Sequence, residues 1–367
     1  MRVLLSGYYG FGNVGDEALL RIIVQRIRAR MPTVEIEALS ATPEATSAQY
    51  GIEATQRRDT GAVRAAIGRA DCLISGGGGL LQNATSTRSL LYYAGLLRAA
   101  HRRKKKTMIF AQSIGPLDGI GKLLVRALCS GVDRASVRDS RSLQTLQPLL
   151  PGTPVERSAD PVFLIDLEPD ERDVRDEGLD PISAPYVLVS VRKHQALRAG
   201  IPAIARAVDR LARVYGLRGV FLPIGGPEDA DVATRVIRAC ESAPMLLPER
   251  SIERSAAIVA SARAVIGMRL HALIFAARFA VPFLAIPYDP KVSALCEDLA
   301  YPLAPLWVPG GEIPENAAID ASVERLMSEH AALSAHLRGA VGALRIGAER
   351  NFEILQDLLD GQDLLDG

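Results

Sequence analysis

Short apolar runs alternate with longer amphipathic segments along most of the chain. Residues 3–6 form such a run, residues 16–30 have the 3.6-residue periodicity of a helix, and residues 34–39 form the next run. The alternation continues to residue 164 and begins again at residues 186–191. Runs that are apolar throughout are typical of parallel strands covered by helices on both faces. The pattern therefore predicts an α/β fold with doubly wound, Rossmann-like parallel sheets.

The chain is long enough for two such units. Its 367 residues exceed what one hydrophobic core usually serves. A charged, proline-containing stretch separates the two alternating regions and reads as a linker. We predict an N-terminal domain at 1–168, a linker at 169–185, a C-terminal domain at 186–320, and C-terminal helices at 321–367 that pack back across both domains. Two domains of this kind are expected to face each other across a cleft.

Composition excludes several classes of protein. A net charge of +1 and an aromatic content of 5% argue against nucleic-acid binding. The four cysteines are far apart, and the histidines have no metal-binding spacing, so we expect neither a metal site nor a disulfide framework. No apolar run of about 18 residues free of charge is present. We expect a cytoplasmic protein; the sequence does not indicate an oligomeric state.

The segment Gly267-Met-Arg-Leu-His271 follows an apolar run and precedes a helical pattern. Arg269 and His271 should therefore lie at the carboxyl end of a strand and in the first turn of a helix, where α/β sheets bind ligands and anions. Arginine suits carboxylate or phosphate, and histidine transfers protons near neutral pH. The alternative is that Arg269 pairs with a structural carboxylate and His271 fills space.

Further charged residues follow other strands of the second half. Arg192 and Lys193 end the strand at residues 186–191, and Tyr288 and Lys291 follow the strand at residues 283–287. Arg192 and Arg269 could converge on one anion. The alternative for Arg192 and Lys193 is a solvated surface role.

Strand-end loops of the first half are candidates for the rest of a substrate site. A formal G-x-G-x-x-G ends at Gly15, but the acidic helix start and the lack of an acid after the second strand argue against a dinucleotide. We expect these loops to approach a ligand closely, or Asp16 simply to cap its helix. The candidate residues are Gly10, Asn13, Gly15, Asp16, Gly77, Gly78, Gln112 and Asp160.

A basic run at residues 101–106 ends one predicted helix. Cations at a helix C-terminus complement the helix dipole, which favours a solvated helix end. Contact with an anionic membrane surface is the alternative.

Eight segments, taken together, resemble the polysaccharide pyruvyl transferase family, and most closely its bacterial cell-surface polymer branch. They occur in family order over most of residues 1–300, with one departure at Ser113, where the family pattern has glycine. The segments are Gly10-Phe-Gly-Asn-Val-Gly-Asp-Glu-Ala, Ser75-Gly-Gly-Gly-Gly-Leu, Gln112-Ser-Ile-Gly-Pro, Val137-Arg-Asp, Ala159-Asp-Pro, Ser190-Val-Arg, Gly267-Met-Arg-Leu-His and Tyr288-Asp-Pro-Lys.

The resemblance implies a two-domain fold similar to glycosyltransferase type B. It implies phosphoenolpyruvate as co-substrate, no other cofactor, and a 4,6-ketal formed on a sugar. The implied acceptor is a lipid-linked saccharide containing N-acetylmannosamine, at the inner membrane face, and the product anchors surface-layer proteins.

The family's Arg-Leu-His motif falls on Arg269, Leu270 and His271, and its upstream donor-binding arginine falls on Arg192. The arginines would hold the donor's anions, and His271 would protonate its methylene carbon. Two rival functions remain: a nucleotide-sugar-dependent glycosyltransferase of the same architecture, and a non-catalytic saccharide-binding protein.

Overall fold

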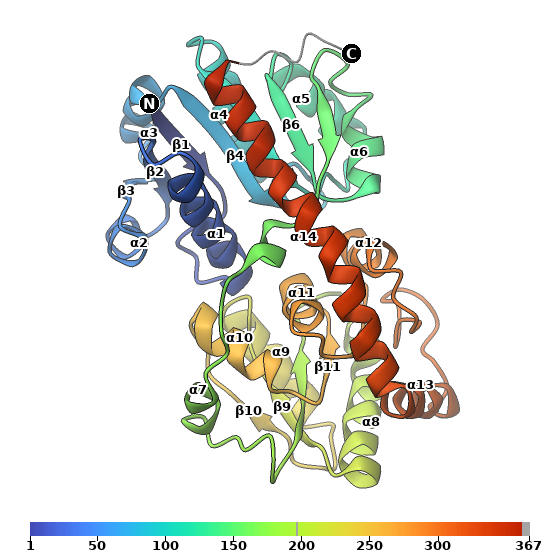
Figure 1. Cartoon of the computed structure of the whole chain (residues 1–367). Helices are drawn as coiled ribbons and strands as arrows, with labels where there is room; N and C mark the ends of the chain where they lie inside the picture. The colour runs from blue at the N-terminus through green and yellow to red at the C-terminus, as the bar shows by residue number, and fades with distance from the viewer. Residues whose placement is uncertain (196, 362–367) are drawn as a thin grey trace. The chain divides into compact units, whose positions relative to one another are not determined.

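The computed structural model describes residues 1–195 and 197–361, and these form two compact units (Figure 1). Unit 1 comprises Met1–Ile165 with Leu344–Gly367, and unit 2 comprises Asp166–Ala343. The end of the predicted C-terminal segment, residues 362–367, lies outside the described residues.

Unit 1 is built on a parallel sheet that, in the described part of the chain, has seven strands in the order β3-β2-β1-β4-β5-β6-β7. Successive strands are added on one side of β1 up to β3, and from β4 onward they are added on its other side. The neighbours β1 and β4 are therefore far apart in sequence. The central strands are almost completely buried, which explains their uniform apolar sequence. The strands are β1 (Arg2–Ser6), β2 (Glu35–Ser40), β3 (Glu53–Gln56), β4 (Cys72–Gly78), β5 (Lys106–Gln112), β6 (Arg134–Val137) and β7 (Val155–Arg157).

Helices cover the sheet of unit 1, and polar residues fix their starts. Asn13 caps the first helix by accepting from the N–H groups of Gly15 and Asp16, and Asp59 caps the third in the same way. The helices of this unit are α1 (Val14–Arg30), α2 (Pro43–Tyr50), α3 (Thr60–Arg69), α4 (Thr87–His101), α5 (Gly119–Leu128), α6 (Ser140–Leu146) and the 3₁₀ turn η1 (Pro161–Leu164).

The last part of α14 (His330–Asp360) belongs to unit 1. Its Glu349 lies 3.0 Å from Arg26 and 2.9 Å from Arg30 of α1. Lys106 donates to the carbonyl groups of Leu358 and Leu359 at 2.7 and 3.0 Å, where the helix dipole favours a cation. Lys106, which the sequence places in a solvated basic run, therefore starts β5 and caps this helix.

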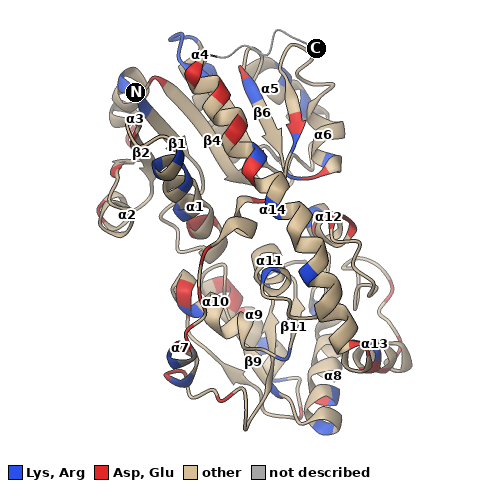
Figure 2. Ribbon diagram, viewed as in Figure 1, with Lys and Arg blue, Asp and Glu red and all other residues tan. Residues whose placement is uncertain are grey.

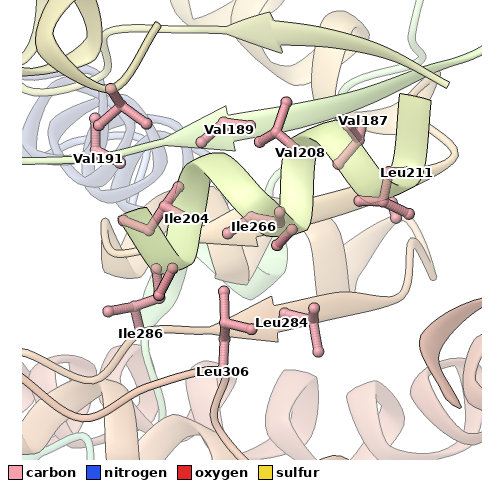
Figure 3. Packing of buried hydrophobic residues seen from close by; sticks show 14 of the residues in the cluster. Val187, Val189, Val191, Ile204, Val208, Leu211, Ile266, Leu284, Ile286 and Leu306 are labelled. Atoms are coloured by element: carbon pink, nitrogen blue, oxygen red, sulfur yellow. The ribbon is translucent and has the colours of Figure 1, made fainter. Parts of the chain in front are cut away.

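Unit 2 contains a smaller parallel sheet, with five strands in the order β10-β9-β8-β11-β12 among the described residues. Its core is mostly aliphatic, and Figure 3 shows strand side chains Val189, Ile266 and Leu284 beside Ile204 and Val208. The strands are β8 (Tyr186–Ser190), β9 (Arg218–Phe221), β10 (Met245–Leu246), β11 (Ala264–Gly267) and β12 (Phe283–Ala285). The helices are α7 (Glu171–Arg175), α8 (Leu197–Tyr215), α9 (Pro227–Ile237), α10 (Ile252–Ala260), α11 (Leu270–Arg278), α12 (Pro290–Asp298), α13 (Asn316–Ser328) and the start of α14.

The predicted α/β class with two doubly wound, Rossmann-like parallel sheets and a helical C-terminus is confirmed. Within the segment predicted as a linker, the structure has the short helix α7. In the described part of the segment predicted as C-terminal helices, the structure has the end of α13, which runs from Asn316 to Ser328, and α14, which starts at His330.

Candidate active site

Arg192 and Arg269 lie at neighbouring strand ends in unit 2. Strands β8 and β11 pair in parallel with Ser190 opposite Gly267, and each arginine follows its paired residue by two positions. This is where the strand order of the sheet reverses, because β9 and β10 lie on one side of the pair and β12 lies on the other. Open α/β sheets bind ligands at such a point.

Arg269 is held by a carboxylate that sequence reasoning did not single out. Its Nε donates to one oxygen of Asp229 at 2.8 Å, and its Nη2 donates to the other at 2.6 Å. Asp229 is 1% exposed, so the pair is a bidentate and largely dehydrated contact. The structure therefore contains the ion pair with a structural carboxylate that was the alternative interpretation of Arg269. This ion pair fixes the plane of the guanidinium.

The loop after β9 completes the support of Arg269. Gly225 N–H donates to Asp229 at 2.9 Å, and the Gly225 carbonyl accepts from Arg269 Nη2 at 3.4 Å. A Cβ atom at Gly225 would lie 2.0 Å from Arg269 Cζ, so only glycine leaves room for the arginine. A signal for Asp229 exists in the sequence, since it follows Pro227 in the first turn of a helix after a Gly-Gly loop.

Arg192 is oriented by Tyr288, which follows β12. Its Nη1 donates to the phenol oxygen at 2.6 Å, and its Cζ lies 4.6 Å from the ring centroid. Its Nε is buried and has no hydrogen-bond partner in the part of the chain that the structure describes. The structure thus brings Arg192 and Tyr288 together.

The first turn of α11 carries Leu270 and His271 immediately after Arg269. Arg269 occupies the N-cap position, and an arginine side chain has no acceptor atom with which to satisfy the helix N–H groups. Leu270 is buried, whereas His271 is half-buried. A helix start without an accepting cap, next to a fixed guanidinium and an imidazole, suits an anion that receives a proton.

Two lysines lie near these groups with different surroundings. Lys193 is exposed, and its Nζ is 3.5 Å from Glu228. Lys291 Nζ is 3.6 Å from Asp289, which caps α12, and 5.9 Å from the centroid of the Tyr288 ring. Lys291 therefore lies near the ring of Tyr288, whereas the charge of Lys193 is exposed to solvent.

Unit 1 has its own point of strand reversal, where the loop after β1 meets the end of β4. Gly10 N–H donates to Glu17 at 2.7 Å, and Tyr50 donates to the same carboxylate at 3.1 Å. Burial raises the pKa of the Glu17 carboxyl above its ordinary value. Carboxylates of Glu17 and Asp16 dominate this helix start, so its charge is opposite to that of the α11 start.

The glycines after Ser75 do not form the loop that the sequence predicts, because β4 continues through Gly78. A Cβ at Gly77 would lie 2.8 Å from Leu19 of α1, and one at Gly78 would lie 3.1 Å from Asp16 Oδ1. The room that these glycines leave is therefore used for packing α1 against β4. Gly10 also leaves room for the chain itself, since its Cβ would lie 2.3 Å from Ser40 Oγ.

Gln112 and Asp160 are buried in contacts within unit 1. Gln112 Nε2 donates to the carbonyl and hydroxyl oxygens of Ser75, both at 2.8 Å, which ties β5 to β4. Asp160 pairs with the buried Arg138 and caps η1. Arg138 Nε also donates to Ser113 Oγ at 2.7 Å, so the serine that departs from the family pattern takes part in this network.

A second cluster near the glycine loop was not foreseen. The Arg57 guanidinium follows β3 and lies 5.0 Å from the Phe11 ring centroid and 4.7 Å from that of Tyr92. It donates to the Gly7 carbonyl at 3.0 Å and to Tyr93 at 3.1 Å. Tyr8 stacks on Phe11 with ring centroids 4.1 Å apart. Arg57 thereby fixes the loop that contains Gly10. The preceding strand, β3, is not an apolar run, so nothing in the sequence indicated that Arg57 follows a strand.

Within residues 1–195 and 197–361, no group of three or more His, Cys, Asp or Glu side chains could hold a metal ion. The same residues contain no helix with the length and apolar character needed to cross a membrane.

Solved structures with the same fold support the architecture. UDP-GlcNAc 2-epimerase from Neisseria meningitidis, bound to UDP-GlcNAc, is 12% identical with a TM-score of 0.66, covering 97% of this chain and 100% of its own. Anabaena HepE in complex with UDP-glucose is 11% identical with a TM-score of 0.64 and covers 98% and 99%. Sucrose-phosphate synthase from Thermosynechococcus elongatus is 12% identical with a TM-score of 0.65 and covers 99% and 100%. These neighbours are glycosyltransferase type B-like, which confirms that part of the predicted fold.

Sequence comparison separates the family from this general fold. No curated protein matches the chain significantly. The profile of the family described as polysaccharide pyruvyl transferase matches residues 13–290, which include Arg192, Asp229, Arg269 and His271 of the unit 2 site. The chain belongs to the polysaccharide pyruvyl transferase family.

Proposed function

We propose that the protein transfers the pyruvyl group of phosphoenolpyruvate to a sugar of a cell-wall polysaccharide precursor, forming a 4,6-ketal and releasing phosphate. The observation that carries this proposal is the placement of Arg192, Arg269 and His271 at adjacent strand ends of unit 2, within the matched family region. A donor with a phosphate and a carboxylate matches two arginines better than one.

The two arginines have different tasks in this proposal. Asp229 neutralises part of the charge of Arg269 and fixes its plane, so this residue orients one anionic group of the donor. Arg192 stacks on Tyr288, which carries no formal charge, and retains its full attraction for an anion. Lys291 adds positive charge near the same ring. The N–H groups at the start of α11 contribute the remaining donors.

His271 is the acid that starts the reaction. The imidazolium gives its proton to the methylene carbon of phosphoenolpyruvate, which leaves a cationic centre at the carbon bearing the phosphate. One sugar hydroxyl attacks that carbon and loses its proton. Departure of phosphate and attack by the second hydroxyl, which also loses its proton, then close the ketal. The C–O bond of the enol phosphate ester is the bond that breaks, and two C–O bonds to the sugar form. Of the two hydroxyl protons, one restores the His271 imidazolium and the other leaves with the phosphate. Chemistry of this kind needs no metal or other cofactor.

The acceptor side of the proposal rests on unit 1. The start of α1 supplies Asn13 and Asp16 as hydrogen-bonding groups for sugar hydroxyls, and the loop after β1 also contains the exposed aromatic ring of Tyr8. Gln112 ties β5 to β4, and Asp160 pairs with Arg138, both from buried positions in unit 1. The finer proposal is a lipid-linked saccharide containing N-acetylmannosamine at the cytoplasmic membrane face, in a pathway that anchors surface-layer proteins.

The test is release of inorganic phosphate from phosphoenolpyruvate in the presence of synthetic N-acetylmannosamine-containing acceptors. We expect release that depends on acceptor, together with a product whose mass increases by pyruvate minus water and whose NMR spectrum contains a ketal methyl signal. Phosphate release that leaves the acceptor unmodified would contradict the transfer and would point to hydrolysis of phosphoenolpyruvate.

Parallel reactions with UDP-sugars separate the rival functions. HepE and the 2-epimerase are the solved neighbours described with UDP-sugars. Release of UDP, with phosphoenolpyruvate left intact, would support a glycosyltransferase. Saccharide binding with neither reaction would support a binding protein and would leave the arginine and histidine arrangement without a catalytic purpose.

A further inference from the structure

Helix α5 of unit 1 has apolar residues on both of its faces. Gly121 and Val125 point inward and are buried, one helical turn apart. Ile120 and Leu123 are 64% and 65% exposed, and they too are neighbours on the helix surface. Exposed Ala127 extends their row by another turn. A surface helix of a soluble protein normally has polar residues opposite its buried stripe, so this outward apolar row needs a partner.

Basic residues border the apolar row. Lys122 and Arg126 are exposed on the same helix, and acidic residues are absent from α5. The positively charged loop at residues 102–105, after α4, adjoins the other end of α5, because a Cβ at Gly131 would lie 2.5 Å from the His101 ring. Figure 2 shows Lys and Arg gathered in this loop. An apolar row flanked by cations complements an anionic lipid surface, with aliphatic groups for the acyl boundary and cations for the headgroups.

We propose that the α5 surface, formed by Ile120, Lys122, Leu123 and Arg126, binds the surface of an anionic lipid bilayer. Ile182, an exposed aliphatic residue in a turn of unit 2, has no such neighbours on a helix face and serves as a comparison with the α5 surface. A single exposed aliphatic residue is common, whereas α5 combines adjacent aliphatic residues with cations on a regular helix.

The helix is held firmly enough to present these side chains together. Asp118 caps α5 by accepting from Gly121 N–H at 2.7 Å. Asn83, in the loop after β4, donates to Asp118 at 2.7 Å and accepts from its N–H at 3.1 Å. The start of α5 is therefore fastened to a loop at the carboxyl edge of the sheet.

That edge is the one at which the loop containing Gly10 lies, since all strands of unit 1 are parallel. Binding through α5 would hold this edge close to the headgroup layer, where a lipid-linked saccharide is available. This consequence depends on the proposed function, whereas bilayer binding itself does not.

The experiment is flotation of the full chain with vesicles, without any substrate. Vesicles of phosphatidylglycerol and phosphatidylcholine in equal amounts are compared with vesicles of phosphatidylcholine alone. We expect binding to the anionic vesicles that weakens at high salt. The double variant I120D/L123D should bind at least about tenfold more weakly, because two aliphatic side chains no longer enter the interface. Replacing Lys122 and Arg126 by Gln should weaken binding about fivefold per charge.

The matched control is Ile182→Asp, which changes an even more exposed aliphatic residue elsewhere, 84% exposed, and should bind as the wild type does. The milder variant Leu123→Ser, with an unchanged thermal midpoint, guards against loss of folding. Absence of wild-type binding to anionic vesicles would overturn the proposal, as would undiminished binding by I120D/L123D. A change of oligomeric state in that variant, without vesicle binding by the wild type, would assign α5 to self-association instead.

Vesicle binding and catalysis can fail separately. If α5 binds lipid, I120D/L123D should turn over a soluble acceptor at the wild-type rate and lose rate only on a vesicle-embedded acceptor. Lipid binding with no pyruvyl transfer would refute the proposed function alone.

Discussion

The ion pair between Arg269 and Asp229 gives a measurable energetic prediction. Asp229 is 1% exposed and accepts from Arg269 Nε, Arg269 Nη2 and Gly225 N–H. Replacing Asp229 by Asn removes the counter-charge and one acceptor oxygen but keeps the other acceptor and the shape. Loss of one partner of a buried pair costs about 3–5 kcal/mol. Because Asn keeps part of the hydrogen bonding, we expect the free energy of unfolding of unit 2 to fall by about 3 kcal/mol, the lower end of this range.

Denaturant unfolding measured by tryptophan fluorescence reports on the correct unit. The chain has one tryptophan, Trp307, which is 3% exposed in the core of unit 2. The control is Glu228→Gln on the adjacent residue, whose side chain is 68% exposed, and it should change the unfolding free energy by less than about 0.5 kcal/mol.

A double-mutant cycle isolates the pair from the rest of the site. Arg269→Gln leaves the buried Asp229 charge uncompensated and should also destabilise unit 2. The double variant D229N/R269Q should be more stable than the sum of the single effects predicts, with a coupling of about 2 kcal/mol. A loss below about 1 kcal/mol in Asp229→Asn, or additivity in the cycle, would refute the view that this pair fixes the guanidinium.

Three further predictions follow from individual contacts. Gly225→Ala places a Cβ 2.0 Å from Arg269 Cζ, so it should displace the guanidinium and lower the unfolding free energy by about 1–3 kcal/mol, measured in urea. The hydrogen bonds from Arg250 hold the pKa of the Glu177 carboxyl below its ordinary value of 4.5. Its stabilisation is therefore complete above that pH and is lost as pH falls through the folded-state pKa, and Glu177→Gln should lose less stability on acidification than the wild type. His271→Gln should lower acceptor-dependent phosphate release about 10²–10⁴-fold, and near-normal turnover would exclude an acid role.

The regular part of the fold could be predicted because each buried strand carries its own signal. The buried strands are apolar runs, and the segments between them have the 3.6-residue period of helices. These strands are β1, β4, β5, β8 and β11. The edge strand β3 was not predicted, since its residues Glu53–Gln56 are half-exposed and polar, and its pairing with β2 supplies the order that its sequence lacks. The strand β10, Met245–Leu246, was not predicted because two residues are too few to show a strand period.

Side-chain partners were harder to predict than strand ends. Residue types and spacing place Arg192 and Arg269 after strands, but nothing local connects Arg269 to a carboxylate 40 positions earlier. Arg192 likewise meets Tyr288 across 96 positions, through the pairing of β8, β11 and β12. The role of the glycines was predicted wrongly for a related reason. The sequence shows that a glycine leaves space, but only the fold shows which group fills it, as Leu19 does beside Gly77.

Electrostatics distinguishes the two strand-reversal points, although both have the same topology. At the first, Asn13 already accepts from the N–H groups that begin α1, and Asp16 and Glu17 follow at once. Such a helix start repels a phosphate and suits neutral hydroxyl groups. At the second, the N-cap is Arg269, whose side chain donates but does not accept, and Arg192 lies at the adjacent strand end. Under the proposed function, fixed cations and the N–H groups at the start of α11 would together stabilise a trianionic donor there. Charge, rather than fold, is therefore our reason for proposing that the donor binds unit 2 and the sugar binds unit 1.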